Sequence, residues 1–237
     1  WGNPLYDWAK MEKNGFAFWR ERIAFMSKFF DGVRIDHFRG FESYFAIPAN
    51  ENTAKNGVWK KGPGMKLFNA VRDAYKDGEI IAEDLGFLTD SVREMLAESG
   101  FPGMKVLQFA FYPYDPSIYL PHNHIENCVV YTGTHDNDTT KGWFTSLRDD
   151  EKAYIAEYMG CGSINPNDVS WMMIKAAFRS VANLCVVPMQ DFLNCGSEAR
   201  LNAPSTFGNN WRWRILDNEC TPELAEKIAR LNRLYQR

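Results

Sequence analysis

Five short apolar runs alternate with segments of helical periodicity along this chain. Each run is predominantly apolar and too short for a helix, which is typical of a strand that helices bury on both faces. The alternation of such strands with helices predicts an α/β fold with a parallel sheet. The expected strands are Val33–Asp36, Glu79–Asp84, Lys105–Phe111, Cys128–Thr132 and Leu184–Asp191.

Apolar residues at helical spacing fill most of the segments between these runs. Helices are expected at Phe16–Phe30, at Met65–Lys76, from Thr89, from Asp149, at Val169–Val181 and at Pro222–Leu234. The aromatic stretch Trp1–Trp8 is interrupted by glycine and proline, so we expect a loop there. Ala46–Gly64 is rich in Asn, Gly and Lys and is also expected to be a loop, one long enough to have a function.

The composition argues against several classes of protein. The net charge of −3 and the even spread of Lys and Arg predict neither a nucleic-acid nor a membrane partner, and no apolar run has the length of a membrane span. The five cysteines are odd in number, widely spaced and free of Cys-x-x-Cys pairs, which predicts reduced thiols in a cytoplasmic protein. The first residue is Trp1, so the chain is expected to begin inside a longer polypeptide.

Acidic residues stand at or just after the ends of three expected strands. These are Asp36, Glu83 and Asp136, and the carboxyl ends of parallel strands are where α/β enzymes build their active sites. Arg34 lies on the same strand face as Asp36 and favours the ionised carboxylate that a nucleophile needs. A structural Arg–Asp pair is the alternative. The recurrence of acids at three strand ends favours catalysis.

Two clusters with metal-ligating residue types lack a complete ligand set. Asp136-Asn137-Asp138 is similar to the start of a calcium loop, but the glycine and the terminal glutamate of such a loop are missing. His122 and His124 have no further ligands at zinc spacing and are expected in a solvated loop after Pro121. No metal site is predicted.

Longer motifs surround the three acids. They are Gly32–Phe41, Ile81–Gly86, Pro102–Phe109, Tyr131–Thr140, Gly196–Asn202 and Asn210–Arg214. Together they resemble the 4-α-glucanotransferases, or amylomaltases, of the α-amylase clan. The resemblance implies transfer of α-1,4-glucan segments between maltooligosaccharides, or glucans derived from starch or glycogen, on a (β/α)8 TIM barrel and without a metal or organic cofactor.

The resemblance also implies a role for each acid. Asp36 matches the nucleophile that forms a covalent glucosyl-enzyme, and Glu83 matches the acid/base, whose pKa should be raised by partial burial and nearby negative charge. Asp136 matches the third acid, which holds sugar hydroxyls. The Asp36 and Glu83 carboxyl groups should lie about 5–5.5 Å apart, the separation found in retaining enzymes.

The implied substrate-binding residues are Arg34, His135, Trp1, Asn202 and His37. Trp1 would offer a ring face to the acceptor sugar, and Asn202 would line the same groove. His135 would hydrogen-bond the sugar held by Asp136. For His37, next to the nucleophile, simple packing or a backbone hydrogen bond is an equal alternative.

The resemblance departs from the family in one respect. The five expected strands are similar to strands four to eight of the barrel, so strands one to three should lie outside this chain. Residues 1–237 are then the C-terminal part of a single catalytic domain, expected to be inactive without the N-terminal remainder of the barrel. Two other functions stay open: an α-amylase-type hydrolase, and a non-catalytic glucan-binding or assembly fragment.

Overall fold

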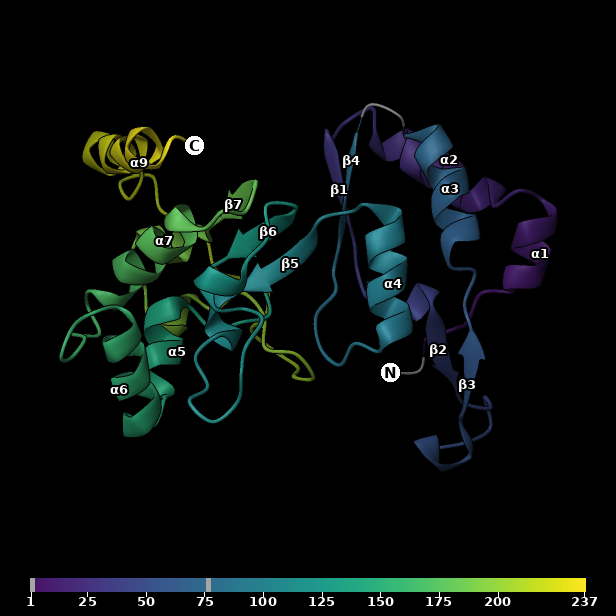
Figure 1. Ribbon diagram of the computed structural model, residues 1–237, viewed down its shortest axis with the longest axis horizontal. Helices are drawn as coiled ribbons and strands as arrows, with labels where there is room; N and C mark the ends of the chain where they lie inside the picture. The colour runs from purple at the N-terminus through teal and green to yellow at the C-terminus, as the bar shows by residue number, and fades with distance from the viewer. Residues whose placement is uncertain (1–2, 76–77) are drawn as a thin grey trace. The chain divides into compact units, whose positions relative to one another are not determined.

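The computed structural model describes residues 3–75 and 78–237 of the chain (Figure 1). The chain forms two compact units that meet in the sequence between Met104 and Lys105. Within the described ranges, none of the helices combines the length and the apolar character needed to cross a membrane.

The first unit is built on two parallel strands. Strands β1 and β4 pair in a register that sets Ile35 opposite Ala82, and both of these side chains are buried. The amide of Ala82 also donates to the carbonyl of Pro102 at 2.9 Å, so the segment leading into the next strand runs along β4. The regular elements are α1 (Trp8–Lys13), α2 (Ala17–Met26), β1 (Gly32–Ile35), β2 (Ser43–Ala46), β3 (Val58–Lys61), α3 (Met65–Ala74), β4 (Glu79–Ala82) and α4 (Asp90–Ser99).

Three helices cover these two strands. Helix α3 contacts both α2 and α4, an arrangement visible in Figure 1. One apolar cluster joins the strands to the helices, and it includes Ile23, Leu67, Phe68, Val71, Ile80 and Met95. The apolar stripes of the helices thus bury the strands as the sequence pattern predicts.

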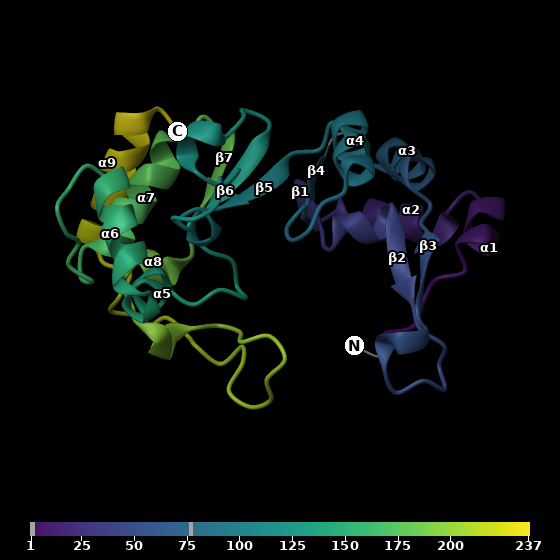
Figure 2. The same ribbon diagram turned by 60° about the horizontal axis from the view of Figure 1, so that its bottom comes forward.

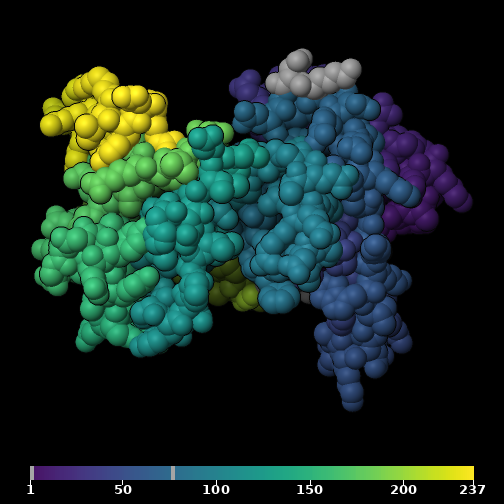
Figure 3. Space-filling view, in the orientation of Figure 1, coloured from purple at the N-terminus to yellow at the C-terminus, as the bar shows by residue number. Residues whose placement is uncertain are grey.

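A hairpin replaces part of the loop expected at Ala46–Gly64. Strands β2 and β3 pair antiparallel, with Phe45 opposite Trp59 and their ring centroids 5.4 Å apart. The loop prediction is wrong for β3 because all four residues of this strand are exposed, so it lacks the apolar run that marks a buried strand. Figure 3 shows the hairpin and its connecting segment projecting from the rest of the first unit.

The second unit begins within β5 and is built on a three-stranded sheet with helices packed against it. The strand order is β5-β6-β7, with β6 and β7 parallel and Val130 opposite Cys185. Helix α7 contacts α5, α8 and α9, and Figure 2 shows it beside β7. The elements are β5 (Gly103–Val106), β6 (Cys128–Tyr131), α5 (Thr140–Ser146), α6 (Asp149–Tyr158), α7 (Val169–Arg179), β7 (Leu184–Val186), α8 (Met189–Phe192) and α9 (Pro222–Tyr235).

The expected α/β class with parallel strands is confirmed, and the described residues do not form a closed barrel. Several boundaries differ from the prediction. The fifth strand, expected at Leu184–Asp191, ends at Val186, and Met189–Phe192 form helix α8 instead. The third strand ends at Val106, where a 3-10 turn (Leu107–Phe109) buries Leu107, because an apolar run looks the same in a strand and in a buried turn. Trp8 begins helix α1, whose first turn is capped by the side chain of Asp7.

Candidate active site

The first group of predicted residues lies at the end of β1. Asp36 follows the last residue of this strand, and Nη2 of Arg34 lies 2.9 Å from its Oδ1. Nε of Arg34 donates to Sδ of Met104 at 3.3 Å, which holds the guanidinium from a second side. The Asp36 side chain is 76% exposed. The strand end therefore presents an accessible carboxylate with a fixed cation beside it.

Glu83 occupies the corresponding place at the end of β4. Its amide donates to the carbonyl of Ile35 at 2.9 Å, which continues the β1–β4 ladder. Its carboxyl group accepts two backbone hydrogen bonds, from the amide of His37 at 2.6 Å and from that of Leu85 at 3.0 Å. Asp36 and Glu83 are thus held at the ends of neighbouring paired strands.

Burial raises the pKa of Glu83 above its ordinary value. The negative charge of Asp36 raises this pKa further, while the amides of His37 and Leu85 and the charge of Arg34 lower it, and the net shift is upward. The rise expected from the sequence is confirmed, with burial as its largest cause. Such a carboxyl group can donate a proton where an ordinary glutamate would already be ionised.

The turn after Asp36 places the amide that contacts Glu83. His37 has a left-handed backbone (φ 49°), a conformation that costs a non-glycine residue about 1–3 kcal/mol. The next residue, Phe38, is fully buried and stacks on Phe68 with ring centroids 5.0 Å apart. Burying a phenylalanine contributes about 1.5–3 kcal/mol, so this anchor offsets the strained residue.

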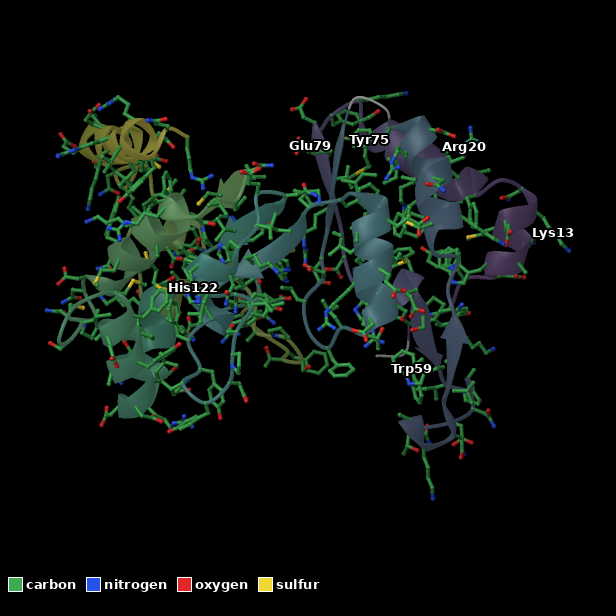
Figure 4. All side chains as sticks on the ribbon, in the orientation of Figure 1. Lys13, Arg20, Trp59, Tyr75, Glu79 and His122 are labelled. Carbon is green, nitrogen blue, oxygen red and sulfur yellow. The ribbon has the colours of Figure 1, made fainter. Side chains whose placement is uncertain are left out.

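A groove of about 1040 Å³ begins beside His37. Arg39 and Trp59 are neighbours in its lining. The guanidinium of Arg39 lies 4.8 Å from the ring centroid of Trp59 and donates to the carbonyl of Phe87 at 3.1 Å. Trp59 is labelled on β3 in Figure 4. Exposed aromatic rings of this kind suit the apolar face of a sugar ring. The lining residues are Asn3, Pro4, Leu5, His37, Arg39, Tyr44, Phe45, Ile47–Ala49, Glu51–Ala54 and Trp59.

The second group of predicted residues gathers around Asp136. Nδ2 of Asn202 donates to Oδ1 of Asp136 at 2.6 Å, and Nε2 of His135 lies 3.5 Å from the same oxygen. Arg200 connects these residues because it donates to the carbonyls of both Asp136, at 2.7 Å, and Asn202, at 2.9 Å. The ring of Trp211 lies beside that of His135, with centroids 5.4 Å apart. Asp136 is thus fixed by the Arg200–Asn202 segment.

Side chains in the two clusters considered as metal sites make hydrogen bonds to other protein groups. Oδ1 of Asn137 accepts from both the amide and the hydroxyl of Thr134. His124 is buried and not solvated as expected. Both of its ring nitrogens make hydrogen bonds, one with the hydroxyl of Ser180 at 2.7 Å and the other with the carbonyl of Tyr119 at 2.9 Å. His122, labelled in Figure 4, lies 3.0 Å from the hydroxyl of Tyr158. In the described part of the chain no three His, Cys, Asp or Glu residues gather as metal ligands would.

The structure brings the predicted residues together as two groups, one in each unit. Arg34, Asp36, His37 and Glu83 form the first, and His135, Asp136 and Asn202 form the second. Trp1, the remaining predicted residue, lies outside the described residues.

Four side chains that shape these groups were not predicted as site residues from the sequence: Arg39, Trp59, Arg200 and Trp211. Arg39, Arg200 and Trp211 stand inside the quoted motifs, which could have indicated them. Trp59 lies in the segment expected to be a functional loop.

The chain is similar to known proteins in both sequence and structure. The family described as 4-alpha-glucanotransferase matches residues 1–219 of the chain. A 4-alpha-glucanotransferase of Clostridium butyricum is 51% identical over 238 residues, which covers 100% of this chain and 48% of the relative. The corresponding protein of Streptococcus pneumoniae serotype 4 is 48% identical over 238 residues, covering 100% of this chain and 47% of the relative.

Among solved structures, the amylomaltase of Streptococcus agalactiae in complex with acarbose matches with a TM-score of 0.92 and 37% identity. The match covers 100% of this chain and 48% of that one. The chain therefore spans about half the length of the relatives that it matches, as the 48% and 47% shares show.

Proposed function

Because the chain belongs to the 4-alpha-glucanotransferase family, we propose that it is the catalytic portion of an enzyme that transfers α-1,4-glucan segments between maltooligosaccharides. The observation that supports this most is the Arg34–Asp36 ion pair beside Glu83 at the ends of two paired strands. One carboxyl group is exposed and paired with a cation, and the other has a raised pKa. This is the division of roles that a retaining double displacement needs.

In the first step, the Asp36 carboxylate attacks the anomeric carbon of the donor glucan. The bond from this carbon to the glycosidic oxygen breaks, and Glu83 gives its proton to the departing oxygen. The products are a covalent glucosyl-enzyme at Asp36 and a shortened glucan that leaves with the proton. The backbone amides of His37 and Leu85 then stabilise the newly ionised Glu83.

In the second step, the 4-hydroxyl of an acceptor glucan attacks the same carbon. Glu83 removes the hydroxyl proton, the ester bond to Asp36 breaks, and both carboxyl groups return to their starting state. Asp136 holds hydroxyls of the reacting sugar and His135 bonds the same sugar, which favours the distorted ring of the transition state. The two steps balance without a metal or an organic cofactor.

The acceptor glucan is proposed to occupy the groove beside His37. His37 both lines this groove and bonds the proton-transferring Glu83, so a sugar there would present its hydroxyl close to the acid/base. The Trp59 ring, backed by Arg39, offers a face on which a sugar can stack.

We further propose that β1, β4, β5, β6 and β7 are strands four to eight of a (β/α)8 barrel and that residues 1–237 are the C-terminal part of one catalytic domain. The length of the relatives supports this, since the chain covers only 48% of the Clostridium butyricum protein. An N-terminal remainder would supply the first three strands. A cytoplasmic location is proposed on the five free cysteines.

The test is the product pattern of the full-length protein on maltotriose. A ladder of longer glucans supports transfer, whereas glucose and maltose alone would identify a hydrolase. Asp36→Asn should lower turnover by at least about 10⁴-fold because it removes the nucleophile. Unchanged turnover in that variant would instead favour a non-catalytic glucan-binding role for this chain.

A further inference from the structure

Asp191 is a buried acid that the proposed chemistry does not use. It lies in the short helix α8 after β7, and only 1% of its surface is exposed. A buried carboxylate is costly unless hydrogen bonds compensate for the lost water. Its partners therefore indicate what the residue holds in place.

The three hydrogen bonds that the described residues donate to the Asp191 carboxyl group come from the two ends of one segment. The hydroxyl of Thr132 donates to Oδ2 at 2.5 Å, and that of Thr140 donates to the same oxygen at 2.8 Å. The amide of Thr140 donates to Oδ1, also at 2.8 Å. Both threonines are fully buried. Thr132 follows β6 and Thr140 begins α5, so the Asp191 carboxyl group closes the base of the 133–139 loop.

The loop closed in this way contains His135 and Asp136 near its middle. Its far side is held by the chain that follows Asp191, since Arg200 and Asn202 both bond Asp136. Ser197 adds a third contact, donating to Oδ2 of Asp138 at 2.6 Å. One continuous stretch, residues 190–202, therefore fixes the loop both at its base and at its acidic middle.

The charge at this position has a thermodynamic cost. Burial raises the pKa of Asp191, as does the negative charge of Asp138, and the hydrogen bonds from Thr132 and Thr140 only partly oppose the rise. A loop that needed stability alone would be served by an apolar contact of similar volume. Three convergent hydrogen bonds provide what an apolar contact does not, namely a defined orientation of the two loop ends.

We propose that Asp191 is a positioning residue for Asp136. By holding both ends of the 133–139 loop, Asp191 keeps the loop in the conformation that directs the Asp136 carboxylate toward the reacting sugar. The inference rests on the proposed glucan transfer, because it concerns the sugar contact assigned there to Asp136. Asp191 itself is buried and has no part in the proposed proton or glucosyl transfer.

The test is a double-mutant cycle in the full-length enzyme. Asp191→Ala, Asp136→Asn and the double variant are compared by acarbose affinity in titration calorimetry and by kcat and KM on maltotriose. Asp191→Ala should weaken acarbose binding about tenfold and lower kcat by at least as much, with KM nearly unchanged. In the Asp136→Asn background it should have no further effect, because the contact it orients is already lost.

Two controls separate positioning from stability. Met173→Ala opens the buried core of the same unit and should lower the unfolding temperature without changing acarbose affinity. Asp191→Asn keeps the side-chain volume and an acceptor for the Thr140 amide, so it should restore affinity to within about threefold of wild type. Should Asp191→Ala fail to fold, Thr132→Ala removes one donor, keeps the acid, and repeats the cycle in a milder form.

The inference and the proposed function fail in different ways. A wild-type enzyme that leaves maltotriose unchanged would overturn the function. A wild-type enzyme that makes the glucan ladder, while Asp191→Ala binds acarbose normally or adds its full effect to that of Asp136→Asn, would overturn the positioning role alone.

Discussion

The backbone amide of His37 donates a 2.6 Å hydrogen bond to Oε2 of Glu83. The residue that follows the proposed nucleophile thereby holds the proposed acid/base. This bond favours the ionised form of Glu83, while burial and the charge of Asp36 favour the protonated form. The opposing effects suit a group that must give up a proton in one step and recover it in the next.

Replacing Arg34 should shift the pH profile in a defined direction. Glu83 must be protonated for the first step, so kcat/KM on maltotriose falls as pH rises through its pKa. The charge of Arg34 lowers this pKa, and Arg34→Met should therefore move the alkaline limb to higher pH while reducing the maximum rate. Arg93→Met, which breaks an exposed pair with Asp90, serves as the control. An alkaline limb that stays in place or moves down would contradict the assignment of Glu83.

Removing the Asn202 amide should weaken the sugar contact made by Asp136. The bond from Asn202 to the Asp136 carboxylate is 2.6 Å long, and hydrogen bonds to charged groups contribute about 1.5–3 kcal/mol. Asn202→Ala is expected to lower kcat/KM on maltotriose by about 10- to 100-fold. Asn209→Ala, at an exposed amide that accepts from Arg212, should leave the rate unchanged. Equal effects of the two substitutions would argue against a role for Asn202.

Trp59 provides a test of the groove. If acceptor sugars stack on its ring, Trp59→Ala should raise the KM for an acceptor such as glucose by about 2- to 13-fold, the change that corresponds to the roughly 0.5–1.5 kcal/mol of an aromatic contact. The initial cleavage of donor glucan, measured with acceptor in excess, should change little. Lys60→Ala, on the neighbouring exposed position of β3, is the matched control. An acceptor KM equal to that of wild type would rule out this surface.

Gly103 tests the packing around Asp84 within the first unit. A Cβ at this position would lie 2.6 Å from Oδ2 of Asp84, whose other oxygen accepts from the amide of Met104 at 2.6 Å. Gly103→Ala should lower the free energy of unfolding by about 1–3 kcal/mol, the usual cost of overpacking. At Gly162 the same Cβ would meet nothing within 4 Å, so Gly162→Ala should have little effect in denaturant unfolding. A neutral Gly103→Ala would show that the Asp84 carboxylate can move aside.

The parts of the fold that could be predicted from the sequence are those with a local signal. Val33–Ile35 and Ile80–Ala82 are short stretches rich in apolar residues, and they form the paired strands that the pattern predicts. The acids that follow them were predicted as site residues from their position alone. Their ion-pair and hydrogen-bond geometry agrees with that interpretation.

The other features of the fold and of the candidate site depend on contacts between distant residues, which no local sequence pattern indicates. The amides that hold Glu83 belong to the backbone of His37 and Leu85, and any residue type supplies an amide. Strand β3 is exposed along its whole length, so its pairing with β2 is set by the partner strand and not by an apolar pattern. Asp191 meets Thr132 and Thr140 across more than fifty residues of chain, a distance that periodicity does not bridge.

The register of β1 against β4 also determines where insertions and deletions can occur without displacing Asp36 or Glu83. Ile35 pairs with Ala82, and Asp36 and Glu83 follow them directly. One residue inserted into either strand would turn its acid to the opposite face of the sheet. The connection between β2 and β3, by contrast, can lengthen or shorten without moving either carboxyl group. Insertions and deletions in this family should therefore collect in the hairpin, while the two paired strands keep a constant length.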